Sequence, residues 1–103
     1  MKLNKLWSNK PTRLYSIASN SISKKHQYIQ ATHAVGQYCL DHPDKWDNGF
    51  LILLQSNDLE KLQKTFEAKG IKYSSFTDPY FGSKVRAISA CDVDDLVKEL
   101  ELI

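Results

Sequence analysis

Apolar positions along the chain fall into two kinds of run. Short runs rich in β-branched and aromatic side chains predict strands at residues 13–18, 50–54, 71–76 and 85–90. Between them, apolar positions recur every three or four residues, which is typical of helices. The run at 50–54 is apolar on both faces, so it is expected to be an inner strand covered on two sides. The predicted order of elements is β-α-β-α-β-β-α.

This order predicts a single α/β domain at residues 13–103, preceded by an N-terminal arm at residues 1–12. Helical connections favour parallel strand pairs, whereas the direct connection between the last two strands allows an antiparallel pair. The fold class is therefore a four-stranded mixed β-sheet with helices packed on both faces. No internal repeat is present.

Each helix has recognisable start and stop signals. The first, at about residues 24–40, follows two candidate capping residues, Ser21 and Ser23. The second is expected to have Asn57 as its cap and to end at Gly70 in a left-handed conformation. The third is expected to begin at Cys91 or Asp92 and to run through Leu100. On the first helix, one face carries Tyr28, Ala31, Thr32, Val35 and Cys39, and an adjacent face carries Ile29, Gly36 and Leu40. The small residues Ala31, Ala34 and Gly36 indicate close packing on a sheet.

Composition narrows the class of protein. With 42% hydrophobic and 25% charged residues, the chain is neither disordered nor of low complexity. Its apolar runs are too short to span a bilayer, and its first residues lack the apolar centre of a signal peptide. Two cysteines, Cys39 and Cys91, are too few for a disulfide framework. We therefore expect reduced thiols in a cytoplasmic protein with no membrane partner.

Charge is distributed unevenly along the chain. Residues 1–40 contain no acidic side chain and carry six basic ones, whereas residues 41–103 carry eight basic and twelve acidic side chains. A segregated charge of this size can steer an anionic partner such as a nucleic acid. The alternative is a basic N-terminal segment that only keeps the protein soluble.

Histidines on the first helix are the first candidates for chemistry. His26 and His33 are seven residues apart, roughly 10 Å along a helix axis, which is too far for both to bind one zinc ion. We expect no metal and no cofactor. His33 is either a packed helix histidine or an acid–base group with a carboxylate partner. Asp78 is the best candidate partner, although Asp78 followed by proline also reads as a turn former.

The loop at residues 77–86 concentrates chemically useful side chains. It contains two aromatic residues, Tyr80 and Phe81, and two cations, Lys84 and Arg86. In such a loop, aromatic rings can stack on bases and the neighbouring cations can bind phosphate. The alternative is that Phe81 fills the core and that the cations are solvated.

Several segments resemble one family. The segment 24–38, KKHQYIQATHAVGQY, resembles the first-helix signature of the peptidyl-tRNA hydrolase II family, a Gln followed by a His-Ala pair on a helix of small residues. The segments WDNGFLILL at 46–54, GI at 70–71 and FTDPYFGSKVRAI at 76–88 are similar to later parts of that family. The resemblance covers about residues 13–102 in the same order, as in a short, divergent member.

The resemblance implies a fold, an activity and an assembly. Members have a compact α/β fold with a mixed four-stranded sheet, usually form dimers, and cleave the ester that joins a stalled peptide to tRNA. They use a Lys at the start of the helix, an Asp in the later loop, and nearby threonines. Asp78 matches that Asp, and Gln30 and His33 match the helix signature. The Lys position falls on or near His26, and the Thr position falls on Arg86.

Two hypotheses follow. In the first, the chain hydrolyses peptidyl-tRNA or a related aminoacyl ester. Its catalytic residues are then Asp78, His33 and His26, and its RNA-binding residues are Lys24, Lys25, Gln30, Lys84 and Arg86. In the second, the chain is a catalytically inactive relative that binds RNA or a protein. His26 and Arg86 favour the second hypothesis, because a mostly neutral ring replaces a permanent cation and a bulky cation replaces a hydroxyl.

Overall fold

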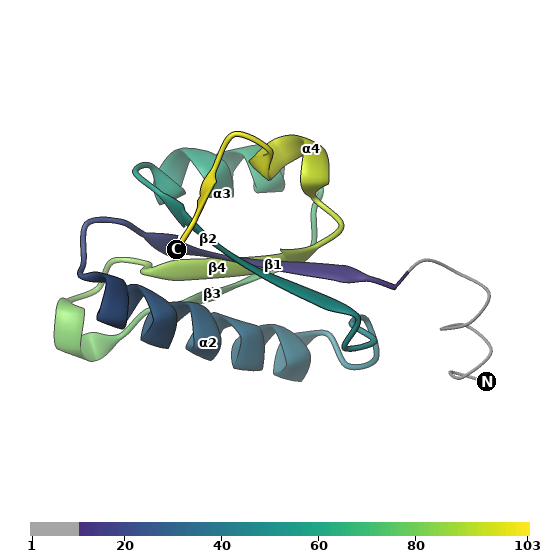
Figure 1. Cartoon of the computed structure of the whole chain (residues 1–103), viewed down its shortest axis with the longest axis horizontal. Coiled ribbons are helices and arrows are strands. Elements are labelled where there is room, and N and C mark those ends of the chain that lie inside the picture. The colour runs from purple at the N-terminus through teal and green to yellow at the C-terminus, as the bar shows by residue number, and fades with distance from the viewer. Residues whose placement is uncertain (1–10) are drawn as a thin grey trace.

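Five strands form one mixed sheet in the order β3-β4-β1-β2-β5 (Figure 1). The computed structural model describes residues 11–103, so most of the predicted N-terminal arm lies outside the described residues. Central strand β1 runs parallel to β2 and antiparallel to β4, and the pairs β3–β4 and β2–β5 are antiparallel. The strands are β1 (Arg13–Ser19), β2 (Phe50–Ser56), β3 (Tyr73–Phe76), β4 (Ala87–Cys91) and β5 (Glu101–Leu102).

Helices cover both faces of the sheet, as the sequence predicts. The long helix α2 (Lys24–Asp41) lies on one face, and α3 (Leu59–Ala68) and the short α4 (Asp94–Val97) lie on the other (Figure 1). A 3-10 turn, η1 (Pro79–Phe81), connects β3 to β4. Within residues 11–103, no helix is long and apolar enough to cross a bilayer. The α/β class and the mixed sheet are therefore confirmed.

The prediction of four strands is wrong, and the error lies at the C-terminal end. The last helix does not run through Leu100 but ends at Val97, and the chain then turns back along β2. Ile103 donates its N–H to the carbonyl of Leu53 at 3.1 Å, and Leu102 pairs with Leu54. This short strand covers part of the edge of β2, whose backbone groups would otherwise lack partners.

Local capping differs from the prediction at two helices. The last helix, α4, begins at Asp94 after Val93, not at Cys91 or Asp92, and no side chain caps it. Asp58, not Asn57, caps α3, because its carboxylate accepts the N–H of Lys61 at 3.0 Å. Ser23 caps α2 by accepting the N–H of His26. Gly70 has a φ of 67°, which is the predicted left-handed position after α3.

Two different layers form the core. Between the sheet and α3, the layer is apolar and includes Ile17, Leu54, Leu59, Phe66, Ile88, Val93 and Val97. Between the sheet and α2, small and polar side chains are buried: Ser16, Ala18, Gln27, Gln30, Ala31, Ala34, Ser74, Ala87 and Ser89. We call these the apolar layer and the polar layer. The expected close packing of small residues of α2 on the sheet is confirmed at Ala31 and Ala34, which are completely buried, and is wrong at Gly36, which is exposed.

Candidate functional site

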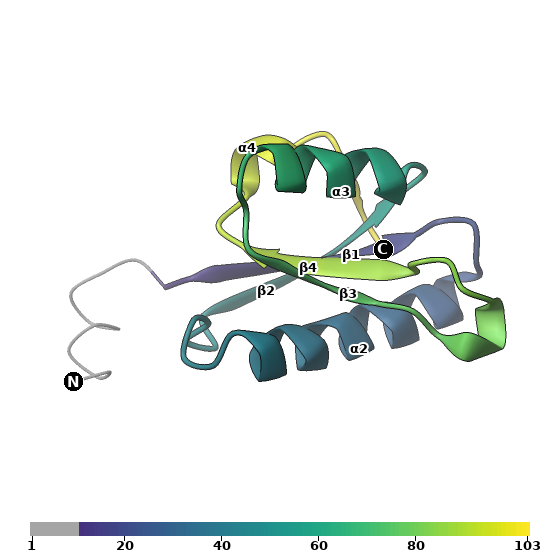
Figure 2. The ribbon, with the colours of Figure 1, turned by 180° about the vertical axis from the view of Figure 1, so that it is seen from behind.

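One end of the sheet gathers the predicted site residues. The register places Phe76 of β3, Ala87 of β4 and Ala18 of β1 in one line across the sheet. The segments beyond this line are the start of α2, which follows β1, and the loop with η1, which follows β3. Figures 1 and 2 both show η1 beside the first turns of α2. Chain segments about 50 residues apart in the sequence therefore meet at this end.

Asp78 is held at the centre of this group. Its carboxylate accepts the side-chain N–H of Gln30 and the backbone N–H of Tyr80, each at 2.9 Å. The pKa of Asp78 is lowered from its ordinary value, mainly by the hydrogen bond from Gln30. The bond from Tyr80 and the charges of His33 and His26 lower it further. Asp78 is therefore ionised at neutral pH. A carboxylate of this kind is a weak base and is better suited to orient a water molecule or to hold a cation.

Gln30 corrects the sequence analysis. We expected it among the RNA-binding residues, but its side chain is completely buried, so it cannot reach a phosphate. Its amide nitrogen donates a hydrogen bond to Asp78 instead, and this bond connects α2 to the loop that follows β3. The side-chain oxygens of Gln30 and Gln27 are buried, and neither has a hydrogen-bond partner among the described residues. Such groups are uncommon in native interiors.

Both histidines lie close enough to Asp78 to affect its charge. His33 is exposed on α2, and its ring stacks on that of Phe76 with centroids 4.5 Å apart and planes 8° apart. His26 is half-buried in the first turn of α2. The structure thus gathers Asp78, His33, His26 and Gln30, although the stack of His33 on Phe76 was not predicted.

The predicted RNA-binding cations form two groups at the same end of the sheet. Lys24 and Lys25 are exposed in the first turn of α2. Lys84 and Arg86 line a hollow of about 440 Å³ between the start of β4 and α3. Arg86 donates to the hydroxyl of Ser21 at 3.4 Å, which ties the β4 end to the loop before α2. Arg86 therefore has a structural contact at this end of the sheet.

Metal-binding chemistry has no support in residues 11–103. There, no three histidine, cysteine or acidic side chains gather in a way that could hold a metal ion. Cys39 is exposed, Cys91 is half-buried, and both are unbridged. The burial of Cys91 raises the pKa of its thiol.

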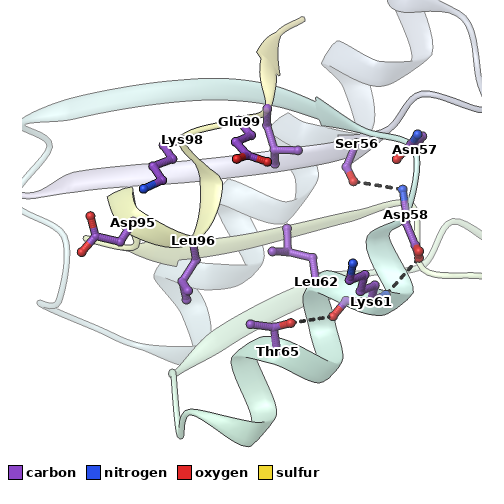
Figure 3. Close-up of a pocket in the computed structure, with 11 residues that line it drawn as sticks. Ser56, Asn57, Asp58, Lys61, Leu62, Thr65, Asp95, Leu96, Lys98 and Glu99 are labelled. Atoms are coloured by element: carbon purple, nitrogen blue, oxygen red, sulfur yellow. Dashed lines mark hydrogen bonds between the residues drawn. The ribbon is translucent and has the colours of Figure 1, made fainter.

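A larger hollow lies on the α3 face of the sheet, opposite to α2 and Asp78. The sequence pattern did not predict it. It measures about 520 Å³ and lies between α3 and the segment that follows α4 (Figure 3). Leu62, Leu96 and Leu100 supply its apolar surface, while Lys61 and Lys98 contribute cations. The described residues that line it include no histidine and no cysteine. Its existence depends on how two helices diverge, which the sequence pattern does not encode.

Comparison with known proteins supports the fold alone. The solved structure of a protein of unknown function, Atu0240 from Agrobacterium tumefaciens strain C58, superposes with a TM-score of 0.71 at 10% sequence identity. The match covers 92% of this chain and 99% of that one. No family model matches the chain, and no curated protein matches it.

Proposed function

We propose that this chain hydrolyses an ester of the peptidyl-tRNA or aminoacyl-tRNA class. In this reaction, water adds to the carbonyl carbon, the bond to the ribose oxygen breaks, and that oxygen takes a proton. The chain would need a group that orients water, a group that moves a proton, and cations for the phosphates. Asp78, the two histidines and the lysines of α2 supply these three functions at one end of the sheet.

The observation that supports this proposal most is the environment of Asp78. A turn former needs only local contacts, and the bond to the backbone N–H of Tyr80 would satisfy it. The bond from Gln30 connects residues 48 positions apart and comes from a buried side chain. A carboxylate held in this way has a constrained orientation, which positioned water requires.

The roles follow from charge and exposure. Asp78 remains ionised and orients the attacking water. His26 or His33 relays the proton to the leaving ribose oxygen, because an imidazole ring can both accept and donate a proton. Lys24 and Lys25 hold the phosphates of the RNA, since both are exposed beside the histidines.

The test is release of peptide from peptidyl-tRNA by the purified protein. Asp78→Asn keeps the shape of the side chain and removes its charge, so the rate should fall by about 10²- to 10⁴-fold. Asp95→Asn, an exposed position on α4, is the matched control and should leave the rate unchanged. A parent protein that releases no peptide from any such ester would refute the proposal.

A second candidate function, RNA binding without hydrolysis, is favoured by His26 and Arg86. If the residue at His26 limits the reaction, His26→Lys should raise the rate of hydrolysis. Changing Lys24 and Lys25 together to Glu should weaken RNA binding and reduce its dependence on salt. The control pair Lys69→Glu and Lys72→Glu carries the same charge change on exposed residues at the other end of the sheet. RNA binding without any turnover would establish the second function.

A further inference from the structure

The ring of His33 is part of a flat aromatic stack. Its centroid lies 4.5 Å from that of Phe76, and the two planes differ by only 8°. Aromatic rings attract one another in near-parallel, offset arrangements of this kind. His33 is exposed, so part of its side chain is open to solvent although one face of the ring is covered by Phe76.

Phe76 anchors this stack to the body of the protein. It is the last residue of β3, and it packs against the small buried residues of the polar layer, Ala18, Ala31, Ala34 and Ala87. His33 is carried by the middle of α2, an 18-residue helix. Both rings therefore stand on regular elements, and a ligand that stacks on them would not have to order a loop first.

The surroundings of the stack suit a nucleotide better than an uncharged ring. Lys24 and Lys25 precede His33 on the same helix, with Lys25 about 12 Å away along the axis at 1.5 Å per residue. Asp78 follows Phe76 by two residues and responds to the charge of His33. A base on the imidazole would thus have the Asp78 carboxylate close by, and the cations for its phosphates lie farther along α2 toward its first turn.

We propose that His33 and Phe76 form a stacking platform for an unpaired terminal base of RNA. This inference rests on the proposed function, because it assigns to the ester-bearing nucleotide a binding position beside Asp78. Stacking is available to every base and needs no hydrogen bonds to the base edges, so the platform selects single-stranded ends rather than a particular sequence. His33 then holds the substrate, and His26 is left as the group that moves the proton.

Two substitutions at His33 separate stacking from proton transfer. Phenylalanine keeps a flat ring and removes the titrating nitrogens, whereas alanine removes both. Binding of a fluorescently labelled oligoadenylate, measured by anisotropy at fixed salt, should be retained in His33→Phe and weakened roughly ten- to hundred-fold in His33→Ala. An abasic oligonucleotide of equal length should bind the parent and His33→Ala equally.

His42 provides the matched control. It lies at the other end of α2 and also contacts an aromatic ring, that of Tyr38, but the two planes are tilted by 43°. Because this pair is not flat, His42→Ala should leave oligoadenylate binding unchanged. Circular dichroism and thermal unfolding of each variant confirm that the fold is retained.

The outcomes distinguish the platform from the hydrolase. Expected binding changes without release of peptide from peptidyl-tRNA would support the platform and refute the hydrolase. Hydrolysis by the parent with equal oligoadenylate binding in all His33 variants would refute the platform and leave the hydrolase intact. Binding that falls equally in His33→Phe and His33→Ala would also overturn the platform, because a polar contact of the imidazole would then explain it.

Discussion

The two layers on either side of the sheet differ in composition more than in size. The apolar layer consists of large side chains such as Phe66 and Ile88, which are completely buried. Apart from Tyr38 of α2, the polar layer consists mainly of alanine, serine and glutamine. Its serines bond to one another and to α2: Ser89 donates to Ser16 at 2.8 Å, and Ser16 donates to the carbonyl of Ala31 at 2.7 Å. One layer removes apolar surface from water, and the other satisfies polar groups at close range.

This difference shows where stability and chemistry reside. Each fully buried large side chain contributes about 1.5–3 kcal/mol, whereas a satisfied hydrogen bond contributes about 1 kcal/mol. The apolar layer therefore supplies most of the stability. The polar layer contributes less to stability, and it contains Gln30, which donates a hydrogen bond to Asp78. The candidate site lies on the layer that can position polar groups.

Removing the largest side chain of the apolar layer should have the largest effect. Phe66 is completely buried and contacts the edge of the Tyr73 ring. Phe66→Ala should lower the free energy of unfolding by about 3–5 kcal/mol, because the transfer free energy is lost and a cavity remains. Urea denaturation followed by circular dichroism measures this. A loss below 1 kcal/mol would contradict our division of stability between the layers.

Adding volume to the polar layer should have the next largest effect. Ala34 is completely buried where α2 approaches the sheet. Ala34→Leu should destabilise the protein by about 1–3 kcal/mol, because the extra carbons force α2 away from the strands. The exposed neighbour Gly36 has open space where a Cβ would lie, so Gly36→Ala is the control and should not destabilise. Equal stability of Ala34→Leu and the parent would show that the layer is loosely packed.

Much of the fold was predictable because most of its elements carry local signals. The strand at 50–54 and the left-handed Gly70 follow from apolar runs and from backbone sterics. The side of α2 that faces the sheet was not predictable in this way. Its buried residues are Gln27, Gln30, Ala31, Ala34 and Tyr38, while Tyr28 and Leu40 face solvent, so the spacing of large apolar residues does not identify this side. Only the small residues Ala31 and Ala34 indicated it. The fifth strand was missed because two residues carry no strand signal, and pairing with β2 alone creates it.

The candidate site was predictable only as a list of side chains. The approach of Asp78 to the first helix follows from strand order, since the ends of β1 and β3 lie at one end of the sheet. The roles of Gln30 and Phe76 do not follow, because both depend on contacts between segments far apart in sequence. The available signal was a glutamine three residues before a histidine, and a sequence does not show that such a glutamine is buried.

A double-mutant cycle in the polar layer should give an effect of intermediate size. Ser16→Ala should cost about 1–3 kcal/mol, because the buried hydroxyl of Ser89 loses its acceptor. The double variant Ser16→Ala with Ser89→Ala should cost less than the sum of the single changes, since no unpaired group is left. Urea denaturation of the four proteins measures the coupling. Strict additivity would mean that the two serines do not act as a pair.

The smallest expected effect is on the acid stability of the polar layer. Asp41, at the end of α2, accepts hydrogen bonds from the Ser74 hydroxyl at 2.7 Å and the Gln37 amide at 2.8 Å, and these lower its pKa. A lowered folded-state pKa means that its contribution is complete above the ordinary value of about 3.8 and is lost as pH falls through the folded-state pKa. Asp41→Asn should therefore lower stability slightly at pH 7 and leave it nearly unchanged at pH 2. Urea denaturation at both pH values tests this. The opposite dependence, with the larger loss at pH 2, would show that the charge of Asp41 does not help to hold α2 on β3.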